Sequence, residues 1–300
     1  MAEYTALAPL FTDIANAIRS KTGETGAITA NSFPDLIRTL QPPTPPISNI
    51  LNDNTWSQIR DVTDKGLQAN YWAVGDVKMD KIDGTFGDTV VNNTYGFFIL
   101  DLVHRPNEEG LGIVFGGFKT DKSGGTDIAI CASNYGYNNQ TVGFLMNQSN
   151  TSSNGWRDSY MRNTIIPQFI VSLSTDLQKN IRTSTIWSHN KPGGSANDNS
   201  NWVTATSDKV YLLAEFEIFG VRTFANSYER YNQAQMTYYK NGNSKVKYRH
   251  SVTSSAVNWW GRSANCSSST NTAFCYVYGD GTENISLPNY SYGFAPCFRL

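Results

Sequence analysis

A run of prolines near the N-terminus constrains the fold more than any other sequence feature. Pro42, Pro43, Pro45 and Pro46 surround a single threonine. Proline fixes φ and has no amide hydrogen, so neither a regular helix nor a paired strand continues through such a run. It favours polyproline II, a stiff spacer that rises about 3 Å per residue. We therefore predict a module over residues 1–41, a linker over 42–46 and a second domain over 47–300.

The module before the linker has the spacing of two short amphipathic helices. Its apolar residues recur three or four positions apart, at Leu7, Leu10, Phe11, Ile14 and Ile18 and then at Phe33, Leu36, Ile37 and Leu40. Two helices of this size cannot bury both apolar faces by themselves. We expect them to pack on copies of themselves or on another protein, as an attachment or oligomerisation module.

Charge excludes several classes of partner. The 300-residue chain has a formal net charge of −1, and charged residues make up only 16% of it. Nucleic acids and anionic membranes are bound through basic surfaces, so we expect neither as a partner. The longest apolar stretch, residues 95–103, contains Asp101 and falls short of the roughly 20 residues that a membrane span needs. The N-terminus lacks the pattern of a secretory signal, which predicts a chain made and kept in a cytoplasm.

The domain after the linker has the pattern of an α+β fold. Short β-like runs alternate with Gly, Asn and Asp turns, and two or three helical segments lie between them. We predict helices at 55–64, capped by Asn54, and at 156–173, with a turn at 176–181. The predicted strands are 96–103, 112–118, 126–131, 209–219, 274–278 and 294–299.

Catalytic and metal-binding patterns are weak in this sequence. His104, His189 and His250 have no partner at zinc-ligand spacing, and we interpret them as ordinary surface or loop residues. Cys131, Cys266, Cys275 and Cys297 form no C-x-x-C pair and are interpreted as small buried apolar residues rather than disulfides. We predict no cofactor and no metal signature, although a calcium site built from loop carbonyls and scattered Asp or Asn stays open.

One pair of glutamates is a candidate for catalysis. Glu215 and Glu217 alternate within the predicted strand 209–219 and would share a face. Paired carboxylates can serve acid and base catalysis. One neighbouring basic side chain would explain them as well, and we favour that structural interpretation.

The segment 251–300 has a sharp compositional bias. It contains 22 Asn, Ser, Thr or Tyr residues, four charged residues and no lysine. Within 274–278, a period of two sets Cys275 and Val277 against Tyr276 and Tyr278, so burial of the first pair would expose both tyrosines. Tyrosine offers a large stiff contact surface, and Ser, Asn and Gly adapt their hydrogen bonds, as in antibody paratopes. A ligand-binding surface is predicted, with a plain polar loop as the alternative.

Several motifs in this segment resemble a known family. They are NWWGRS at 258–263, FCYVYGDG at 274–281 and YGFAPCF at 292–298. With TWSQI at 55–59, GWRDSYMR at 155–162, LLAEFEIFG at 212–220 and YKNGNS at 239–244, they resemble the C-type-lectin-fold domain common in gut Firmicutes and their phages. The resemblance runs from about residue 50 onward. Residues 12–40 resemble an N-terminal module of phage tail and baseplate proteins.

The resemblance implies a variable protein of a diversity-generating retroelement, in which adenine-specific mutagenesis rewrites codons over about 255–295. The implied scaffold residues are Trp259, Trp260, Phe274, Cys275, Val277, Gly293, Phe294 and Pro296. The implied variable, ligand-binding residues are Ser263, Asn265, Ser267, Ser268, Ser269, Thr270, Asn271, Thr272, Tyr276, Tyr278, Asn284, Ser286, Asn289, Tyr290, Ser291 and Tyr292.

The function implied is that of a non-catalytic phage tail-tip adhesin, assembled in the host cytoplasm and carried on the virion. Its ligand would be a bacterial cell-surface protein or glycan, its N-terminal helices would bind phage tail or baseplate proteins, and a homotrimer is expected. Two alternatives stay open. One is a bacterial carbohydrate-binding lectin unrelated to phage. The other is an enzyme of the formylglycine-generating type, which shares the fold and would use Cys266 and Cys275.

Overall fold

A computed structural model describes residues 2–23, 25–34, 36, 46–103, 112–131, 144–193, 198–266 and 272–300. The chain divides into two compact units, Met1–Ile47 and Ser48–Leu300. The division falls after Ile47, one residue beyond the proline-rich segment, of which residues 42–45 lie outside the described residues.

The first unit is built on one long helix, α1 (Ala2–Thr22), followed by the 3-10 turn η1 (Ala30–Ser32). Ala15, Ile18 and Phe33 are buried together. The second predicted apolar run is described only in part, because Ile37 and Leu40 lie outside the described residues. Leu10 and Phe11 remain 51% and 43% exposed. The apolar face of α1 is therefore covered only in part within this unit.

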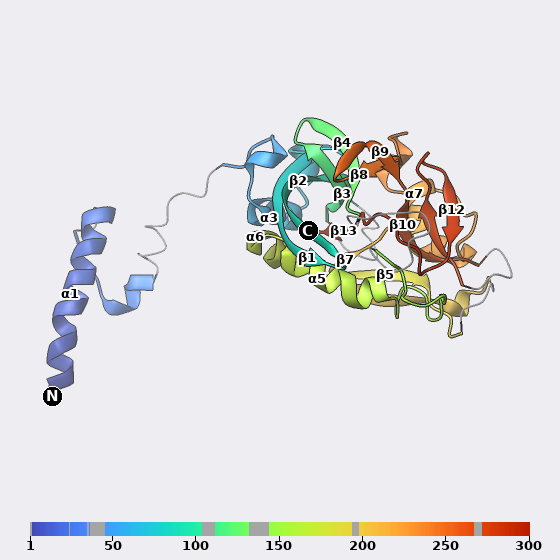
Figure 1. Cartoon of the computed structure of the whole chain (residues 1–300). Coiled ribbons are helices and arrows are strands. Elements are labelled where there is room, and N and C mark those ends of the chain that lie inside the picture. Colours follow the sequence, from blue (N-terminus) through green and yellow to red (C-terminus); the bar gives the residue numbers. More distant parts are fainter. Residues whose placement is uncertain are drawn as a thin grey trace. The chain divides into compact units, whose positions relative to one another are not determined.

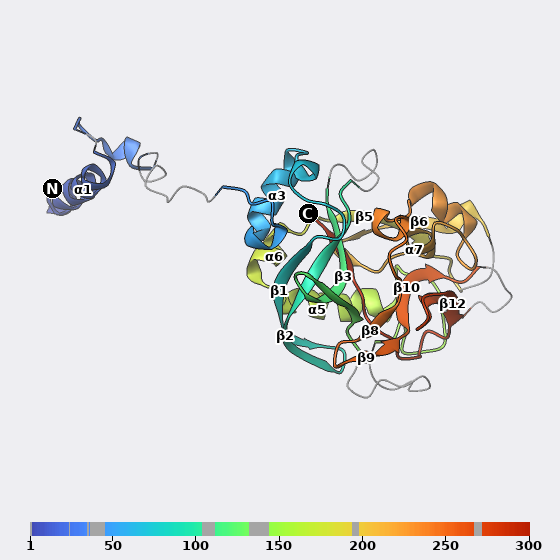
Figure 2. The same cartoon turned by 90° about the horizontal axis from the view of Figure 1, so that it is seen from above.

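The second unit is organised around an eight-stranded sheet (Figures 1 and 2). Its strand order is β1-β2-β3-β4-β8-β9, and β13 joins it by pairing with both β3 and β7. All its pairs are antiparallel except β4 with β8. The strands are β1 (Val77–Phe86), β2 (Thr89–Asp101), β3 (Val114–Asp121), β4 (Gly124–Ala129), β7 (Val210–Tyr211), β8 (Lys247–Arg249), β9 (Val252–Val257) and β13 (Cys297–Arg299).

Two smaller sheets complete the unit. One pairs β5 (Ser184–His189) with β6 (Val203–Asp208), and the other has the order β10-β11-β12, with β10 (Trp259–Ala264), β11 (Phe274–Val277) and β12 (Glu283–Ser286). In Figures 1 and 2 the labels β10 and β12 lie across the unit from β1 and β2. The predicted α+β class is confirmed.

The helices of this unit are short. They are α3 (Trp56–Asp64), α5 (Ile166–Ser172), α6 (Thr175–Asn180), α7 (Glu215–Phe219) and α8 (Thr237–Lys240). Short 3-10 segments are η2 (Leu51–Asp53), η3 (Gln68–Asn70), η5 (Ser200–Trp202) and η6 (Ser227–Asn232), and η4 (Met161–Ile165) is π-helical. The helix predicted at 55–64 is confirmed, but its cap is Thr55, whose hydroxyl accepts from the Gln58 amide at 3.1 Å. Asn54 instead accepts from the Ser48 amide.

The strand predicted over 209–219 is wrong beyond its first residues. After β7 the chain turns into α7, which ends at Gly220 in the left-handed region with φ of 72°. The Glu217 carboxylate accepts from the Ala214 amide at 2.9 Å, and this caps the first turn. Glu215 and Glu217 therefore lie on a helix instead of sharing one face of a strand.

The core beneath the large sheet is aromatic. Trp56 of α3 packs edge-on against Phe115 of β3 and Phe298 of β13, with ring centroids 5.3 and 5.9 Å apart. Its indole N–H donates to Asp80 of β1 at 2.7 Å. Because Phe298 follows the predicted variable segment in sequence, that segment is anchored at its far end in the main core.

Candidate functional site

The eight residues assigned to the scaffold are all buried. The indole of Trp260 donates to the Phe144 carbonyl at 2.7 Å, and that of Trp259 donates to the Lys245 carbonyl at 2.9 Å. Gly293 bridges to Trp259, and a Cβ at Gly293 would come within 2.7 Å of the Ala129 Cβ. Only glycine fits this position without displacing the neighbouring strand.

Five of the predicted ligand-binding residues are buried, and their predicted exposure is wrong. They are Ser263, Asn265, Tyr276, Ser291 and Tyr292, all with 3% exposure or less. The rings of Tyr276 and Trp260 each lie 4.7 Å from the ring of Tyr292. The Tyr292 hydroxyl also lies 2.8 Å from the Ser286 hydroxyl. These tyrosines pack on the scaffold itself, because the strand face that was expected to meet solvent is covered by the segment containing Tyr292.

The accessible members of the predicted set that the structure describes lie in β12 and in the segments next to β11 and β12. Tyr278 is 41% exposed and Asn284 is exposed, while Thr272, Ser286, Asn289 and Tyr290 are partly buried. Ser267, Ser268, Ser269, Thr270 and Asn271 lie outside the described residues. The Tyr278 amide donates to the Thr282 carbonyl at 2.8 Å, and Asp280 accepts from the Thr282 amide and hydroxyl. A hydrogen-bonded turn thus positions Tyr278.

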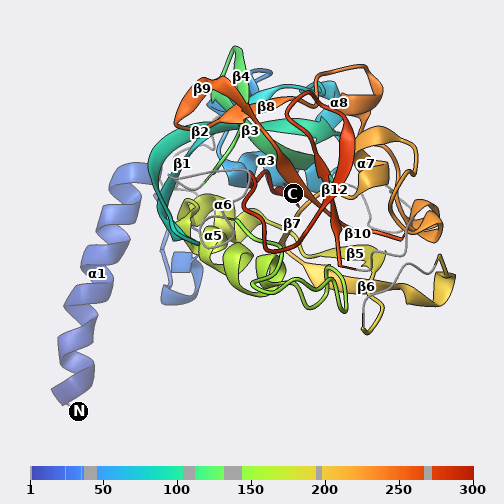
Figure 3. The ribbon, with the colours of Figure 1, turned by 45° about the vertical axis from the view of Figure 1, so that its right-hand side comes forward.

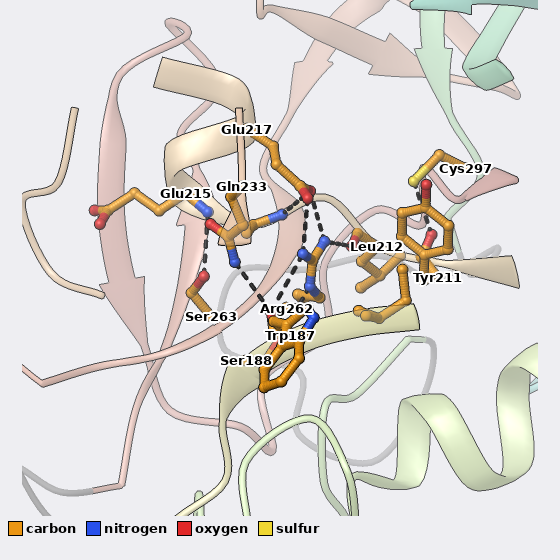
Figure 4. A network of polar contacts seen from close by, with 12 residues as sticks. Trp187, Ser188, Tyr211, Leu212, Glu215, Glu217, Gln233, Arg262, Ser263 and Cys297 are labelled. Atoms are coloured by element: carbon orange, nitrogen blue, oxygen red, sulfur yellow. Dashed lines mark hydrogen bonds and ion pairs between the residues drawn. The ribbon is translucent and has the colours of Figure 1, made fainter. Parts of the chain in front are cut away.

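Behind this sheet lies a buried ion pair, in which Arg262 is the basic partner that the sequence alone did not identify (Figure 4). Arg262 of β10, 1% exposed, donates to both carboxylate oxygens of Glu217, at 2.6 and 2.8 Å. It also donates to the Leu212 carbonyl at 2.7 Å. Burial alone would lower the pKa of Arg262, but the adjacent Glu217 carboxylate outweighs it and the pKa is raised. The basic partner expected for the glutamates is confirmed for Glu217.

The carboxylates of Glu215 and Glu229 accept hydrogen bonds from backbone amides and a hydroxyl instead of pairing with an arginine. The Glu215 carboxylate accepts from the amides of Thr223, Phe224 and Ala225 at 2.8 to 3.1 Å. Glu229 accepts from the Ser263 hydroxyl at 2.7 Å, and burial raises its pKa. Figure 4 shows the carboxylates of Glu215 and Glu217 pointing apart. They are therefore structural anchors for the neighbouring segments, and they do not form an acid and base pair.

The histidines and cysteines occupy structural positions where they are described. His189 is 2% exposed at the end of β5, so its surface assignment is wrong, and burial lowers its pKa to about 4. His250 is partly buried and accepts from the Cys131 amide, and His104 lies outside the described residues. All four cysteines are buried and unbonded to one another, as predicted. Burial raises the pKa of the Cys275 thiol, which disfavours a thiolate nucleophile there.

Within the described ranges, no three or more His, Cys, Asp or Glu side chains are grouped as a metal site. Over the same ranges, no helix has the length and apolar character that a membrane crossing demands.

Fold and site together define an α+β domain in which a charge-poor polar surface is mounted on a buried aromatic scaffold. The chain belongs to the family described as Domain of unknown function (DUF6273), whose profile matches residues 139–300. That range includes the scaffold, the Arg262 ion pair and every predicted ligand-binding residue. A search of curated proteins and a search of solved structures each find no match.

Proposed function

We propose that this protein is a phage tail-tip receptor-binding protein with a C-type lectin fold, whose C-terminal surface is diversified by a retroelement. The observation that carries the proposal is a contrast in exposure between residues in and beside one small sheet. Tyr278 and Asn284 reach solvent, whereas Trp260 and Tyr276 are enclosed behind them. A surface that must accept many side chains needs such separation, because changes at exposed positions leave the core packing intact.

The chemistry of the accessible residues suits binding. Tyrosine supplies a large contact area and has little rotamer freedom to lose, and asparagine and serine adapt their hydrogen bonds to different partners. The ligand is a protein or glycan on a bacterial cell surface. Buried anchors such as the Arg262–Glu217 pair hold the strand beneath the surface in place.

The first unit supplies attachment and multivalency in this proposal. Leu10 and Phe11 leave apolar surface on α1 for a second copy or a tail protein. Display on a homotrimer would strengthen weak binding at each site through effective concentration.

A comparison of gene copies and their surroundings tests the retroelement. We expect a nearby reverse-transcriptase gene and a template repeat that matches the 3′ part of the gene except at adenines. Substitutions between copies should fall at Tyr278, Asn284 and other accessible positions, and should spare Ser263, whose hydroxyl bonds to buried Glu229. Identical copies, or differences unrelated to adenines, would overturn diversification.

A binding assay tests the adhesin function separately. The fluorescently labelled full chain is applied to a panel of gut Firmicutes strains, and a Tyr278→Ala, Asn284→Ala double variant is compared with it. We expect binding to a subset of strains, lost in the variant at unchanged melting temperature. A Lys179→Gln variant, altered at an exposed residue of α6, serves as the control. Equal binding by both variants would contradict the proposed surface, and one tight sugar ligand shared by all natural variants would favour the non-phage lectin.

A further inference from the structure

A second cluster of exposed aromatic residues lies beside the predicted variable segment, on η6. Tyr228 and Tyr231 are 38% and 61% exposed, and their ring centroids are 6.0 Å apart. The Arg230 guanidinium lies over the Tyr231 ring, 5.0 Å from its centroid, and donates to the Tyr231 hydroxyl at 3.1 Å. Tyrosine and arginine are the residue types enriched among those that dominate binding at protein interfaces.

The backbone beneath this cluster is fixed by buried polar residues. Asn226, 1% exposed, accepts from the Tyr228 amide at 3.0 Å, and its side-chain amide donates to the Asn199 carbonyl at 3.0 Å. Glu229, also 1% exposed, accepts from the Ser263 hydroxyl and from the His189 amide. Because Glu229 is buried while its neighbours on both sides are exposed, the aromatic cluster is held in place before any ligand arrives.

The cluster adjoins the end of β10, where the predicted variable residues begin. The Cys266 amide, two residues beyond β10, donates to the Phe224 carbonyl at 2.6 Å. The hydrogen bond from Ser263 of β10 to Glu229 of η6 is a second link between the two segments. Figure 3 shows β10 and α7 on the same side of the domain as β5 and β6. None of the η6 residues belongs to the predicted variable set, so this surface would stay constant while its neighbour changes.

Arginines and carboxylates both lie around the cluster. Arg222 lies 3.6 Å from Asp198, and the Ser227 amide donates to the same Asp198 at 2.6 Å. Arg222 is thus paired with Asp198, the Glu229 carboxylate is buried beneath the cluster, and Arg230 is the exposed cation on η6 itself. The exposed Arg230 guanidinium offers a positive charge to an anionic ligand.

We infer that the η6 surface is a constant subsite for an anionic polysaccharide. The Tyr228 and Tyr231 rings would stack on the apolar faces of sugar rings, and the Arg230 guanidinium would pair with a carboxylate or phosphate, which it can contact through two parallel hydrogen bonds. Uronic-acid polymers and phosphodiester-linked wall polymers share this chemistry. The inference rests on the proposed cell-surface binding, and it adds a contact that diversification does not alter.

Binding of the full chain to immobilised polygalacturonate and to glycerol-phosphate teichoic acid tests this inference, with neutral dextran as the reference. We expect binding to at least one anionic polymer and none to dextran, and the preferred polymer identifies carboxylate or phosphate as the anion. Tyr231→Ala and Arg230→Gln should each weaken binding about tenfold. Lys179→Gln removes one exposed positive charge on α6 and should change binding less than about twofold.

The outcomes separate this inference from the diversified surface. Tyr278→Ala should leave polysaccharide binding unchanged, and loss of binding to bacterial cells in that variant concerns the variable surface alone. Two results together would overturn the subsite: binding to poly-glutamate as tight as to the polysaccharides, and polymer binding by both η6 variants no weaker than that of Lys179→Gln. They would show that polymer binding is general charge attraction. A change of oligomeric state in Tyr231→Ala, seen by sedimentation without any change in polymer binding, would make η6 an interface between copies and also overturn it.

Discussion

Tyr276 and Tyr278 lie two residues apart with ring centroids separated by 6.3 Å, yet Tyr276 is 3% exposed and Tyr278 is 41% exposed. The reason is that Tyr276 is within β11 and is covered by Tyr292, whereas Tyr278 follows the end of the strand. Tyr276 and Tyr278 fall on the same face in a pattern of period two, yet they have different physical roles. One belongs to the aromatic core, and the other is available to a ligand.

Alanine substitutions at these two tyrosines should separate the roles. Tyr276→Ala removes a buried ring beside Trp260 and Tyr292 and should lower the free energy of unfolding by about 3 to 5 kcal/mol. Tyr278→Ala should change it by less than about 0.5 kcal/mol. Urea unfolding followed by tryptophan fluorescence measures both. A large destabilisation by Tyr278→Ala would show that its ring is part of the core.

The Arg262–Glu217 pair should be sensitive to removal of one partner. Glu217→Gln leaves a buried guanidinium without its carboxylate and should destabilise the domain by about 3 to 5 kcal/mol. The matched control is Asp83→Asn at the exposed Lys81–Asp83 pair, where we expect less than about 1 kcal/mol. Denaturant titrations measure the free energy of unfolding of both variants. A similar loss of stability in the two variants would contradict the burial of the Arg262–Glu217 pair.

Lys247 should reduce stability at neutral pH. Its ammonium is buried, has no hydrogen-bond partner among the described residues and lies over the rings of Phe98 and Trp259. Burial lowers its pKa to about 8. The folded pKa is below the unfolded value, so this lysine destabilises the fold below pH 8, and the penalty fades as pH rises toward 10.5.

Lys247→Met should therefore stabilise the domain at pH 7 by about 1 to 3 kcal/mol, with a smaller gain near pH 10. Lys119→Met is the matched control, because Lys119 is paired with the largely buried Asp127 and its loss leaves that carboxylate without this cation. The control should destabilise by about 3 kcal/mol. Thermal and urea unfolding at pH 7 and pH 10 measure both variants. Destabilisation by Lys247→Met would refute the conclusion that the buried Lys247 ammonium lowers stability.

His189 should make the domain acid-sensitive. Its pKa falls from 6.5 to about 4 on burial, so the unfolded chain binds the extra proton between these values and stability is lost as pH falls through that range. The loss attributable to His189 is about 3 kcal/mol by pH 4. His189→Asn keeps an acceptor for Asn226 and removes the titration. Urea unfolding of the parent protein and of His189→Asn, from pH 7 down to about pH 4, gives the difference in their free energies of unfolding. A difference that does not change with pH would contradict this prediction.

The exposed apolar face of α1 should govern self-association. Leu10→Ser removes an apolar side chain that is 51% exposed and should shift the protein toward monomer, because the association would be driven by burial of that face. Lys21→Ser, at an exposed position of the same helix, should leave the oligomeric state unchanged. Sedimentation velocity at several concentrations checks both variants. A monomeric parent protein would remove the basis for the expected trimer.

The parts of the fold that could be predicted from the sequence share strong local signals. The helix near 55–64 has a capping box and an apolar face, and the strand at 96–103 is a nearly continuous apolar run. The strand predicted over 209–219 was wrong because α7 has only five residues. In so short a segment, the three-to-four-residue spacing of a helix cannot be distinguished from the alternation of apolar and polar residues in a strand. Its helical form depends on Glu217, which caps the turn and pairs with Arg262, 45 residues away.

The candidate site was predictable in composition but not in exposure. Its bias toward Asn, Ser, Thr and Tyr marks the region, and the scaffold residues are buried where they were expected. Whether a given tyrosine reaches solvent depends on what covers it, and Tyr276 is covered by Tyr292, which lies in a later segment of the chain. The η6 cluster was missed because two tyrosines and an arginine in a six-residue turn form no recognisable motif.

The position of β13 in the main sheet has a consequence for a gene whose 3′ codons are repeatedly rewritten. This strand is encoded after the codons that we propose are rewritten, yet it pairs with β3 and β7 and places Phe298 against Trp56. A copy that gained a premature stop or a shifted reading frame would lack the strand that joins two parts of the main sheet. We expect such defective copies to fail to fold and to be degraded, so that the architecture itself screens out faulty products before assembly.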